Sequence, residues 1–592
     1  MPVLFFRRNC LAFSCLAFAD CPGSFENGQE GMDMRTIYGA NLGILPGDDP
    51  RLALVIKEAL AKLHGIENVS LTLEPGEYHF YPQYAASGRF SISNHHKCEE
   101  RAVAFWLEDF THFEINGAGS RFIFHTDILP FYLHKSRNIS FRDFSVDYAI
   151  PAYSEGEIIS VSRQKMVVKI NPEKYQWQVK DHCLYFTGEN YCHPLHLSME
   201  MDSMSGGPAY GTDDLYFGTP QQEVGLHPFI EQVDSDKVCF TLREEEHFFA
   251  GSRAGNKLVL RHHPRSNPVF YASDTDDLRL EKVKIHHAEG MGILAERCTN
   301  ISLYDFHVLP EERNPRCFSA SADAAHFVGC AGKIVLEGCR FEKQMDDGVN
   351  VHGFYSPVEK KMGDNQLMLG WGHPEQVGVR LAREGDEAAI MGARSLRPVW
   401  KGRFESVTLL GQGVLAVFDR QLPEAFPENA VVENLTLSPN VVIRKCEFRR
   451  NRARGILLTC RKALVEDCVF ETAGAAVYLE GEACSWYESG AVGSIVIKNN
   501  HFLNCAYIPA WGEAPVTVCP KVESDEDWYY HENLELVKNR FACFDERVLY
   551  ARHIRRILLM DNIYCQTGAY PPREGRRFDL ANYGFFSEEY NL

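Results

Sequence analysis

The sequence predicts an all-β chain: a right-handed parallel β-helix with two small inserted antiparallel β-barrel-like domains and an N-terminal helical cap. Three observations lead to this prediction. A short apolar signature recurs at intervals of 22 or 23 residues, for example from Val441 to Ala463 and from Leu278 to Ile301. Two longer stretches with alternating, strand-like patterns interrupt this period. One amphipathic segment precedes the first repeat.

The residues before the first repeat predict a helix followed by a strand. Residues 49–64 (DPRLALVIKEALAKLH) space their apolar residues as an amphipathic helix does. Residues 69–82 (VSLTLEPGEYHFYP) alternate as a strand and turn at Pro75-Gly76. Because an open stack of strands needs protected ends, we expect this segment to cap the β-helix.

The repeated unit is an apolar pair two residues apart, a bend of one extra residue, a Cys, Asn or apolar residue, and then an aromatic or apolar residue. Such a pattern predicts two short strands joined by a bend and not a helix. A β unit of about 23 residues, repeated, is typical of a parallel β-helix, whose crossovers are right-handed. The Cys and Asn positions should stack as ladders inside it. The units start at Ile139, Leu278, Ile301, Ile334, Val441, Ala463, Ile495, Leu534 and Ile557.

The two interruptions divide the chain. Strings such as GEIISVSRQKMVVKI and RFESVTLLGQGVLAVF alternate like antiparallel strands. The second interruption begins directly after His352-Gly353, so we expect it to overhang the wall that carries the preceding residues. The expected segments are 1–33 (leader or signal-like), 34–150 (cap and first coils), 151–260 (inserted β domain), 261–353 (coils), 354–435 (second inserted β domain) and 436–592 (C-terminal coils).

Composition and charge exclude some classes of partner. The chain of 592 residues is 45% hydrophobic and 24% charged, an ordinary globular composition. Its formal net charge of −19 argues against a nucleic-acid or anionic membrane partner, since both attract cationic surfaces. No apolar run after the leader approaches the length of a membrane-spanning helix.

The cysteines favour a reducing compartment. There are 19 of them, an odd number, with no CxxC pair, which is not typical of a disulfide framework or a zinc knuckle. Cys339, Cys446 and Cys468 occupy one repeated position in apolar runs, where a thiol acts as a small hydrophobe. A cytoplasmic location is therefore slightly favoured. Secretion or export to the periplasm is the alternative, because CLAFSCLAFA after Arg7-Arg8 resembles a weak signal segment.

Three aspartates are the candidate catalytic residues. Asp323 and Asp347 open corresponding strands of consecutive coils, and Asp346 precedes the second of them. Neighbouring coils lie about 4.8 Å apart, so these carboxylates should lie within roughly 5 to 10 Å of one another. That separation suits glycoside hydrolysis, in which one carboxyl group protonates the leaving oxygen and another activates water or attacks. Like charges this close raise the pKa of one member. Arg454 opens the same strand on the next coil and could orient a carboxylate or bind a sugar hydroxyl.

Further residues are candidates for substrate binding. Besides Arg454, these candidates are His352, Asn350, His326, Trp486 and Glu488. The aromatic ring in the WYESG string could stack on a sugar, and its acid could accept a hydroxyl. No metal site is expected here, because the histidines and acids do not form a ligand-like cluster in the sequence. Serine-hydrolase, zinc-protease and nucleotide-binding motifs do not occur in the sequence.

Several longer strings resemble glycoside hydrolase family 110. They are SRNISFRDFSVDYAIP, EGMGILAERCTNISLYDFHVLP, DAAHFVGCAGKIVLEGCRFEKQMDDGVNVHG, RARGILL and WYESGAV, and the resemblance extends from about residue 35 over most of the chain. It implies a right-handed β-helix with two inserted β-barrels. It also implies an exo-acting, inverting alpha-1,3-galactosidase that uses blood-group-B-type or linear alpha-galactosyl glycans, without a cofactor and as a homodimer. The catalytic aspartates of the family fall on Asp323, Asp346 and Asp347.

Two other classes of function stay open at this stage. A β-helix polysaccharide lyase would need a calcium cluster and a basic residue, and the acidic wall with one arginine disfavours it. A non-catalytic glycan-binding β-helix would release no sugar. Which aspartate acts as acid and which as base depends on burial, so the sequence leaves it undecided.

Overall fold

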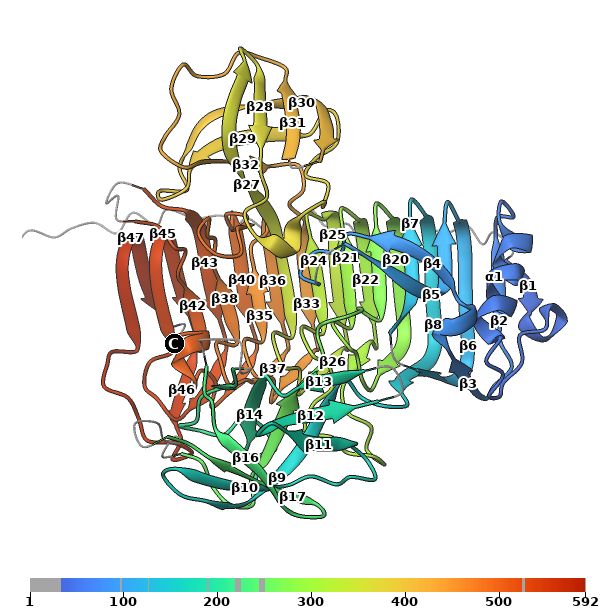
Figure 1. Ribbon diagram of the computed structural model, residues 1–592. Coiled ribbons are helices and arrows are strands. Elements are labelled where there is room, and N and C mark those ends of the chain that lie inside the picture. The colour runs from blue at the N-terminus through green and yellow to red at the C-terminus, as the bar shows by residue number, and fades with distance from the viewer. Residues whose placement is uncertain are drawn as a thin grey trace, which may run out of the picture.

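The chain folds as an all-β protein around a long stack of parallel strands (Figure 1). The computed structural model describes residues 34–95, 98–125, 127–188, 191–218, 225–243, 251–411, 413–523 and 528–590. The expected leader, residues 1–33, lies outside these ranges. The all-β prediction is confirmed: within the described ranges, strands dominate and one α-helix is present, α1 (Leu52–Leu63).

The stack has three walls of parallel strands, and several long strands turn a corner from one wall into the next. The first wall contains β1 (Arg35–Tyr38), β2 (Val69–Thr72), β6 (Thr111–Phe124), β8 (Arg137–Tyr148), β20 (Asp276–Ile285), β22 (Thr299–Tyr304), β25 (Ala331–Glu337), β33 (Asn440–Arg444), β36 (Lys462–Glu466), β40 (Ser494–Lys498), β43 (His531–Val537), β45 (Leu549–Met560) and β47 (Phe578–Glu589).

The second wall continues the same coils beyond the bend. Besides the second parts of β6, β8 and β20, it contains β3 (Glu77–Phe80), β23 (His307–Val308), β26 (Arg340–Glu342), β34 (Glu447–Arg449), β37 (Val469–Glu471), β41 (His501–Leu503), β44 (Arg540–Cys543) and β46 (Ile563–Gln566).

The third wall closes each coil and carries the candidate site. It contains β5 (Glu99–Glu108), β7 (Ile128–His134), β19 (Phe270–Ser273), β21 (Ile293–Glu296), β24 (Ala325–Val328), β27 (Val349–Gly363), β35 (Ile456–Leu458), β38 (Val477–Leu479), β42 (Val516–Val518) and the first parts of β45 and β47. Strand β4 (Ala86–Phe90) adds to β5 in the antiparallel sense.

Equivalent positions of the predicted repeat pair with one another in the first wall. Ile139 pairs with Leu278, which in turn pairs with Ile301. The same position continues through the remaining units to Leu534 and Ile557. Each unit is therefore one coil, as predicted.

Ladders of like side chains fill the inside of the stack, as expected. The rings of Phe448, Phe470, Phe502 and Phe541 stack on successive coils with centroids 4.5 to 5.2 Å apart. Beside them the backbone N–H of Cys468 donates to the Asn500 side chain at 2.8 Å. The amides of Asn500, Asn539 and Asn562 continue this ladder. Buried amides that bond to the next coil satisfy the backbone groups exposed by the bend.

The bend itself requires a left-handed backbone. One residue per coil, directly before the Cys or Asn of the ladder, has a positive φ angle. Gly338 and Asn499 are two examples, with φ of 69° and 55°. Gly and Asn adopt this conformation more readily than other residues. This explains why the sequence inserts one extra residue between the two apolar pairs.

Residues 153–261 leave the stack between β8 and β19 and form mainly antiparallel structure. Seven strands pair in the order β15-β14-β18-β9-β10-β17-β16, and a smaller sheet has the order β11-β12-β13. The bounds are β9 (Tyr153–Val161), β10 (Lys165–Lys169), β11 (Trp177–Lys180), β12 (Cys183–Thr187), β13 (Cys192–Pro194), β14 (Leu197–Met201), β15 (Leu215–Tyr216), β16 (Phe229–Asp234), β17 (Lys237–Thr241) and β18 (Lys257–Arg261).

A second antiparallel unit grows out of β27 and closes on itself. Strand β27 pairs with β28, and the pairings β28–β31, β31–β30, β30–β29 and β29–β32 lead back to β27. Six strands therefore form a closed barrel, which projects from the stack (Figure 1). The bounds are β28 (Gln366–Leu369), β29 (Glu387–Gly392), β30 (Pro398–Leu410), β31 (Gly413–Phe418) and β32 (Ala430–Asn434), with the short η4 (Pro374–Gln376) in a loop.

At the N-terminal end of the stack (Figure 1), α1 packs mainly against β5 and also contacts β3, β4 and η3 (Pro82–Tyr84). Its apolar face, including Leu52, Ile56 and Leu60, joins the continuous core of the stack. The remaining short elements are η2 (Gly39–Leu42), β39 (Glu488–Ser489) and η5 (Pro509–Trp511).

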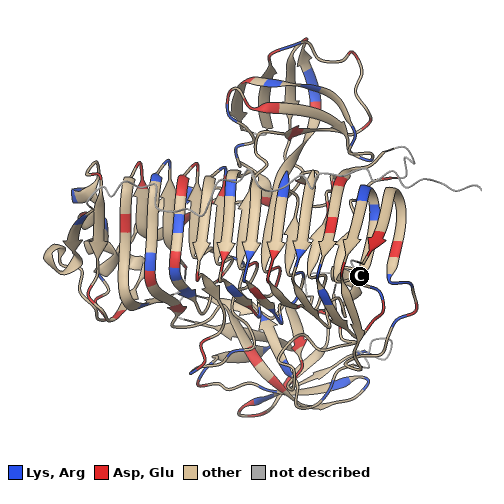
Figure 2. Cartoon of the chain, turned by 180° about the vertical axis from the view of Figure 1, so that it is seen from behind, with Lys and Arg blue, Asp and Glu red and all other residues tan. Residues whose placement is uncertain are grey.

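Acidic and basic residues are interspersed over the stack and both antiparallel units, and neither sign gathers in one region (Figure 2). Among the described residues, no helix has the length and apolar character needed to span a bilayer.

Candidate active site

Asp323, Asp347 and Arg454 stack on three consecutive coils at the start of the third wall. Ala325 pairs with Val349, and Val349 pairs with Ile456, so the residues two positions earlier are aligned. Their backbones are also bonded to one another. The backbone N–H of Ala324 donates to the carbonyl oxygen of Asp347 at 3.1 Å, and the N–H of Gly348 donates to that of Arg454 at 3.0 Å. This is the alignment that the sequence predicted.

The three aspartates form one compact cluster. One oxygen of each of Asp323, Asp346 and Asp347 lies within 4.8 Å of the other two. The side chains of Asp323 and Asp347 are only 5% and 1% exposed, whereas that of Asp346 is 17% exposed. Asp346 is therefore the outermost carboxylate, and the other two form a buried pair behind it.

Asp323 is held by a chain of hydrogen bonds through two histidines. Its Oδ2 lies 2.6 Å from His326 Nδ1, and its Oδ1 accepts from the backbone N–H of Asp347 at 3.1 Å. His326 Nε2 lies 2.8 Å from His352 Nε2, and His352 Nδ1 lies 2.7 Å from the carbonyl oxygen of Gly353. Both rings are buried, and burial lowers the pKa of both imidazoles to about 3.

The direction of this chain places a proton on Asp323. A carbonyl oxygen only accepts, so Nδ1–H of the neutral His352 donates to Gly353. His352 Nε2 must then accept from His326 Nε2–H, which leaves His326 Nδ1 as an acceptor. The group that donates to it is the protonated carboxyl of Asp323. Burial, followed by the charge of Asp346, raises the pKa of Asp323 to about 8, in agreement with this assignment.

Asp347 is bound to Arg454. The Arg454 Nε–H donates to Oδ1 and Oδ2 of Asp347 at 2.9 and 3.1 Å, and its backbone N–H donates to Oδ1 at 2.8 Å. Burial raises the pKa of Asp347 to about 7, and the guanidinium of Arg454 opposes that rise. Arg454 also lies 3.6 Å from a carboxylate oxygen of Glu480.

Asp346 is bound to a residue that sequence reasoning missed. Arg265 Nη2 donates to Asp346 Oδ2 at 2.9 Å. Burial by itself would raise the pKa of Asp346, but Arg265, then Arg452 and Arg454, lower it below its usual value. Arg265 lies between β18 and β19, where the chain returns from the first antiparallel unit, and no repeat predicts its place.

The other expected residues lie along the same wall. Asn350 is buried on β27, next to His326 on β24, and its Oδ1 has no hydrogen-bond partner. Glu488 lies on β39, which pairs with β27. Its carboxylate lies 3.5 Å from His352 Nε2. Burial raises the pKa of Glu488 well above its usual value.

Trp486 lies where the closed barrel meets the wall. The residue is 37% exposed, and its ring stacks on that of His373 with centroids 4.0 Å apart. The loop containing η4 continues over the wall: Gln376 bonds to the Trp486 carbonyl, and the carbonyl of Glu375 accepts from Asn94 N–H at 3.2 Å. The barrel therefore contacts the wall beyond His352 through this loop.

Comparisons with known proteins give a consistent result. The family model for GLAA-B beta-barrel domain I matches residues 154–252. An alpha-1,3-galactosidase A of Shewanella woodyi is 31% identical over 542 residues, which cover 90% of this chain and 86% of the relative. An alpha-1,3-galactosidase B of Bacteroides thetaiotaomicron is 28% identical over 548 residues, covering 92% and 88%.

Some solved structures align with most of the chain but are more distant in sequence. An exopolygalacturonase from Thermotoga maritima has a TM-score of 0.38 and 11% identity, over 90% of this chain and 92% of its own. The A-module of an Azotobacter vinelandii mannuronan C-5 epimerase has a TM-score of 0.37 and 10% identity, over 92% and 99%.

Proposed function

The chain belongs to glycoside hydrolase family 110, the family of the alpha-1,3-galactosidases, and we propose that it is an exo-acting, inverting alpha-1,3-galactosidase. Its substrates would be glycans that end in alpha-1,3-linked galactose, of the blood-group-B type or linear. The observation that carries the proposal is the cluster of Asp323, Asp346 and Asp347 on adjacent coils, held by Arg265 and Arg454. The homodimer implied by the resemblance is part of the proposal.

The proposal includes the domain organisation expected from the sequence. Residues 151–260 and 354–435 would be inserted domains, and the helix of residues 52–63 would cap the stack. The antiparallel pairings within residues 153–261 and the closed barrel that begins in β27 support this division. The burial of α1 against the first coils supports the cap.

Asp346 is the proposed general acid. In an exo-acting enzyme the terminal sugar occupies the inner end of the site and the leaving chain points to solvent, so the acid must be the outer carboxylate. Asp346 is the most exposed of the three. Arg265 keeps it ionised in the free enzyme. A bound sugar removes its remaining contact with water and raises its pKa, which favours the protonated form that the reaction needs.

Asp347 is the proposed general base, and Asp323 holds the attacking water with it. Arg454 opposes the rise in the pKa of Asp347, and a pKa of about 7 suits a base that works near neutrality. In the reaction, water attacks the anomeric carbon and loses a proton to Asp347. The bond from that carbon to the glycosidic oxygen breaks, and the oxygen takes a proton from Asp346. The chemical step leaves the number of protons on the cluster unchanged. Each cycle therefore begins when Asp346 takes up a proton as the sugar binds, and it ends when Asp347 releases a proton to water.

The remaining residues divide into two groups in this proposal. Both nitrogens of His326 and of His352 are engaged in the chain that orients Asp323, so these histidines position the carboxyl group and do not bind sugar. Asn350, whose Oδ1 is without a hydrogen-bond partner, and Glu488 are the candidates for binding galactose hydroxyls. Trp486 offers one ring face at the rim, since its other face stacks on His373.

The test of the function is proton NMR of the purified protein with alpha-1,3-galactobiose. We expect galactose to appear first as the β anomer. The oxygens of the cluster lie closer together than the roughly 6.5–9.5 Å typical of inverting pairs. The stereochemical outcome therefore tests the proposal most directly. Early α anomer would contradict inversion, and absence of galactose would contradict hydrolysis.

A second candidate function is a β-helix polysaccharide lyase, because the aspartate cluster could also hold a cation. The two functions respond differently to a chelator. EDTA should abolish a calcium-dependent lyase, whereas the hydrolysis proposed here uses only side chains of the chain and should be unaffected.

Replacing Arg454 with Gln should shift the pH profile. The cation lowers the pKa of Asp347, so its removal raises that pKa further and the base stays protonated to a higher pH. We expect the acidic limb of the profile of kcat/KM to move to higher pH in Arg454→Gln and to move less in Arg454→Lys. Arg449→Gln, in the second wall, is the matched control. An unmoved limb in Arg454→Gln would contradict the assignment of Asp347 as the base.

A further inference from the structure

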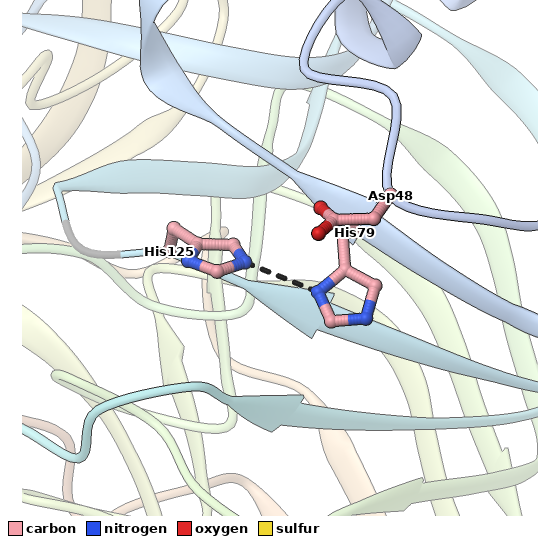
Figure 3. A group of neighbouring side chains, drawn as sticks. All are labelled: Asp48, His79 and His125. Carbon is pink, nitrogen blue, oxygen red and sulfur yellow. Dashed lines mark hydrogen bonds between the residues drawn. The ribbon is translucent and has the colours of Figure 1, made fainter.

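A second cluster of ligand-type side chains lies at the N-terminal end of the stack, away from the aspartates. It consists of Asp48, His79 and His125 (Figure 3), and one ligand atom of each lies within 4.8 Å of the other two. Four steps of the second wall, β6–β8–β20–β23–β26, separate its coil from the coil that leads into Asp346. At about 4.8 Å per step the two clusters are roughly 19 Å apart along the axis of the stack.

Backbone pairing brings the three residues together. His79 lies on β3, His125 directly follows β6, and the N–H of His125 donates to the carbonyl of Phe80 at 2.9 Å. Asp48 lies in the loop before α1. This loop is tied to β3 because Gly47 donates to the carbonyl of Glu77 at 2.8 Å and accepts from the N–H of His79 at 3.1 Å. The cluster is therefore a fixed product of the fold.

The histidine nitrogens face each other at a separation that suits a metal ion. His79 Nδ1 and His125 Nε2 are 3.1 Å apart. Two nitrogens bound to one tetrahedral zinc ion at about 2.0–2.1 Å would be about 3.3 Å apart. A small change in their separation, and a change of tautomer in His125, would direct both lone pairs to a shared ion. Asp48 is exposed, so its carboxylate can move to complete the set.

The surroundings provide the second layer of contacts that metal sites need. His79 Nε2–H donates to the carboxylate of Glu77 at 3.0 Å, which fixes Nδ1 as the unprotonated nitrogen that faces His125. Tyr81 donates to Asp48 Oδ1 at 2.6 Å and stacks on the ring of His125 with centroids 3.8 Å apart. Asp48 and Glu77 together balance the charge of a divalent ion.

We propose that Asp48, His79 and His125 bind a divalent transition-metal ion of the zinc class, with water at the remaining position. Two imidazoles and one carboxylate are typical zinc ligands, whereas calcium and magnesium prefer oxygen ligands only. The ion joins the loop before α1 to β3 and to the end of β6, so it fastens the first coil of the stack.

The test uses the full-length protein without a histidine tag, freed of metal by EDTA and gel filtration. Zinc binding is measured by calorimetry, and cobalt is added separately to follow its visible absorption. We expect one zinc ion per chain, a cobalt spectrum typical of mixed nitrogen and oxygen ligands, and a higher melting temperature with zinc. In hydrogen exchange, the segments around Asp48 and His79 should become better protected.

Variants decide where the ion binds. The double variant His79→Gln/His125→Gln should lose the bound zinc and the thermal shift, and Asp48→Asn should weaken binding at least about tenfold. His501→Gln, an exposed histidine elsewhere on the stack, is the matched control and should bind as the wild type does. Asp323→Asn should also bind one ion. Zinc binding that survives the double histidine variant, or that is lost in Asp323→Asn, would overturn the proposal.

Discussion

Asp346→Asn should lower kcat on alpha-1,3-galactobiose by about 10²–10⁴-fold, the range for loss of a general acid, while hydrolysis of alpha-galactosyl fluoride persists. The physical reason is the leaving group. A sugar alkoxide needs a proton as the bond breaks, whereas fluoride leaves without one. Asp347→Asn should lose activity on both substrates, because attack by water needs the base whichever group departs. The measurement is kcat for each variant on each substrate.

The matched control is Asp467→Asn, which lies in an exposed bend with a positive φ angle that Asn adopts readily. It makes the same chemical change outside the cluster, so it should leave both activities unchanged. If Asp347→Asn and not Asp346→Asn kept the fluoride activity, the two roles would be exchanged. Equal losses on both substrates in both variants would contradict any separation of acid and base.

The parts of this arrangement that follow from periodicity could be predicted from the sequence. Asp323, Asp347 and Arg454 open equivalent strands, so counting along the repeat was enough to place them side by side. The ladder of Cys468 and Asn500 was visible for the same reason. The pairing of strands in a repeat follows from positions along the sequence alone, and each further repeat gives the same alignment again.

Contacts made outside the repeat could not be predicted in this way. Arg265 reaches Asp346 from the segment that returns from the first antiparallel unit, 81 residues away in the sequence. The link between His326 and His352 depends on side-chain rotamers, although both residues were noticed. The Asp48 cluster joins a loop to two strands before the regular repeat begins. In each case the decisive geometry comes from packing, which a pattern of residue types does not contain.

Asp323→Asn should remove a pH-dependent loss of stability together with most of the activity. The carboxyl of Asp323 has a native pKa raised to about 8, against about 3.9 in an unfolded chain. Between these values the unfolded state releases the proton and the native state keeps it. The contribution of protonated Asp323 to the free energy of unfolding is therefore complete below the unfolded pKa. It is lost as the pH rises through the native pKa, by up to about 1.4 kcal/mol per pH unit.

Asparagine is the right replacement because its amide can donate to His326 Nδ1 as the protonated carboxyl does, and it cannot ionise. The hydrogen-bond chain to Gly353 is thereby preserved, so a loss of activity does not come from misfolding. We expect the melting temperature of the variant, relative to wild type, to rise between about pH 5 and about pH 8. Asp467→Asn should follow the wild type over the same range. A melting-temperature difference that does not change with pH would mean that Asp323 is ionised in the free protein, and the proton assigned to it would have to lie on His326 instead.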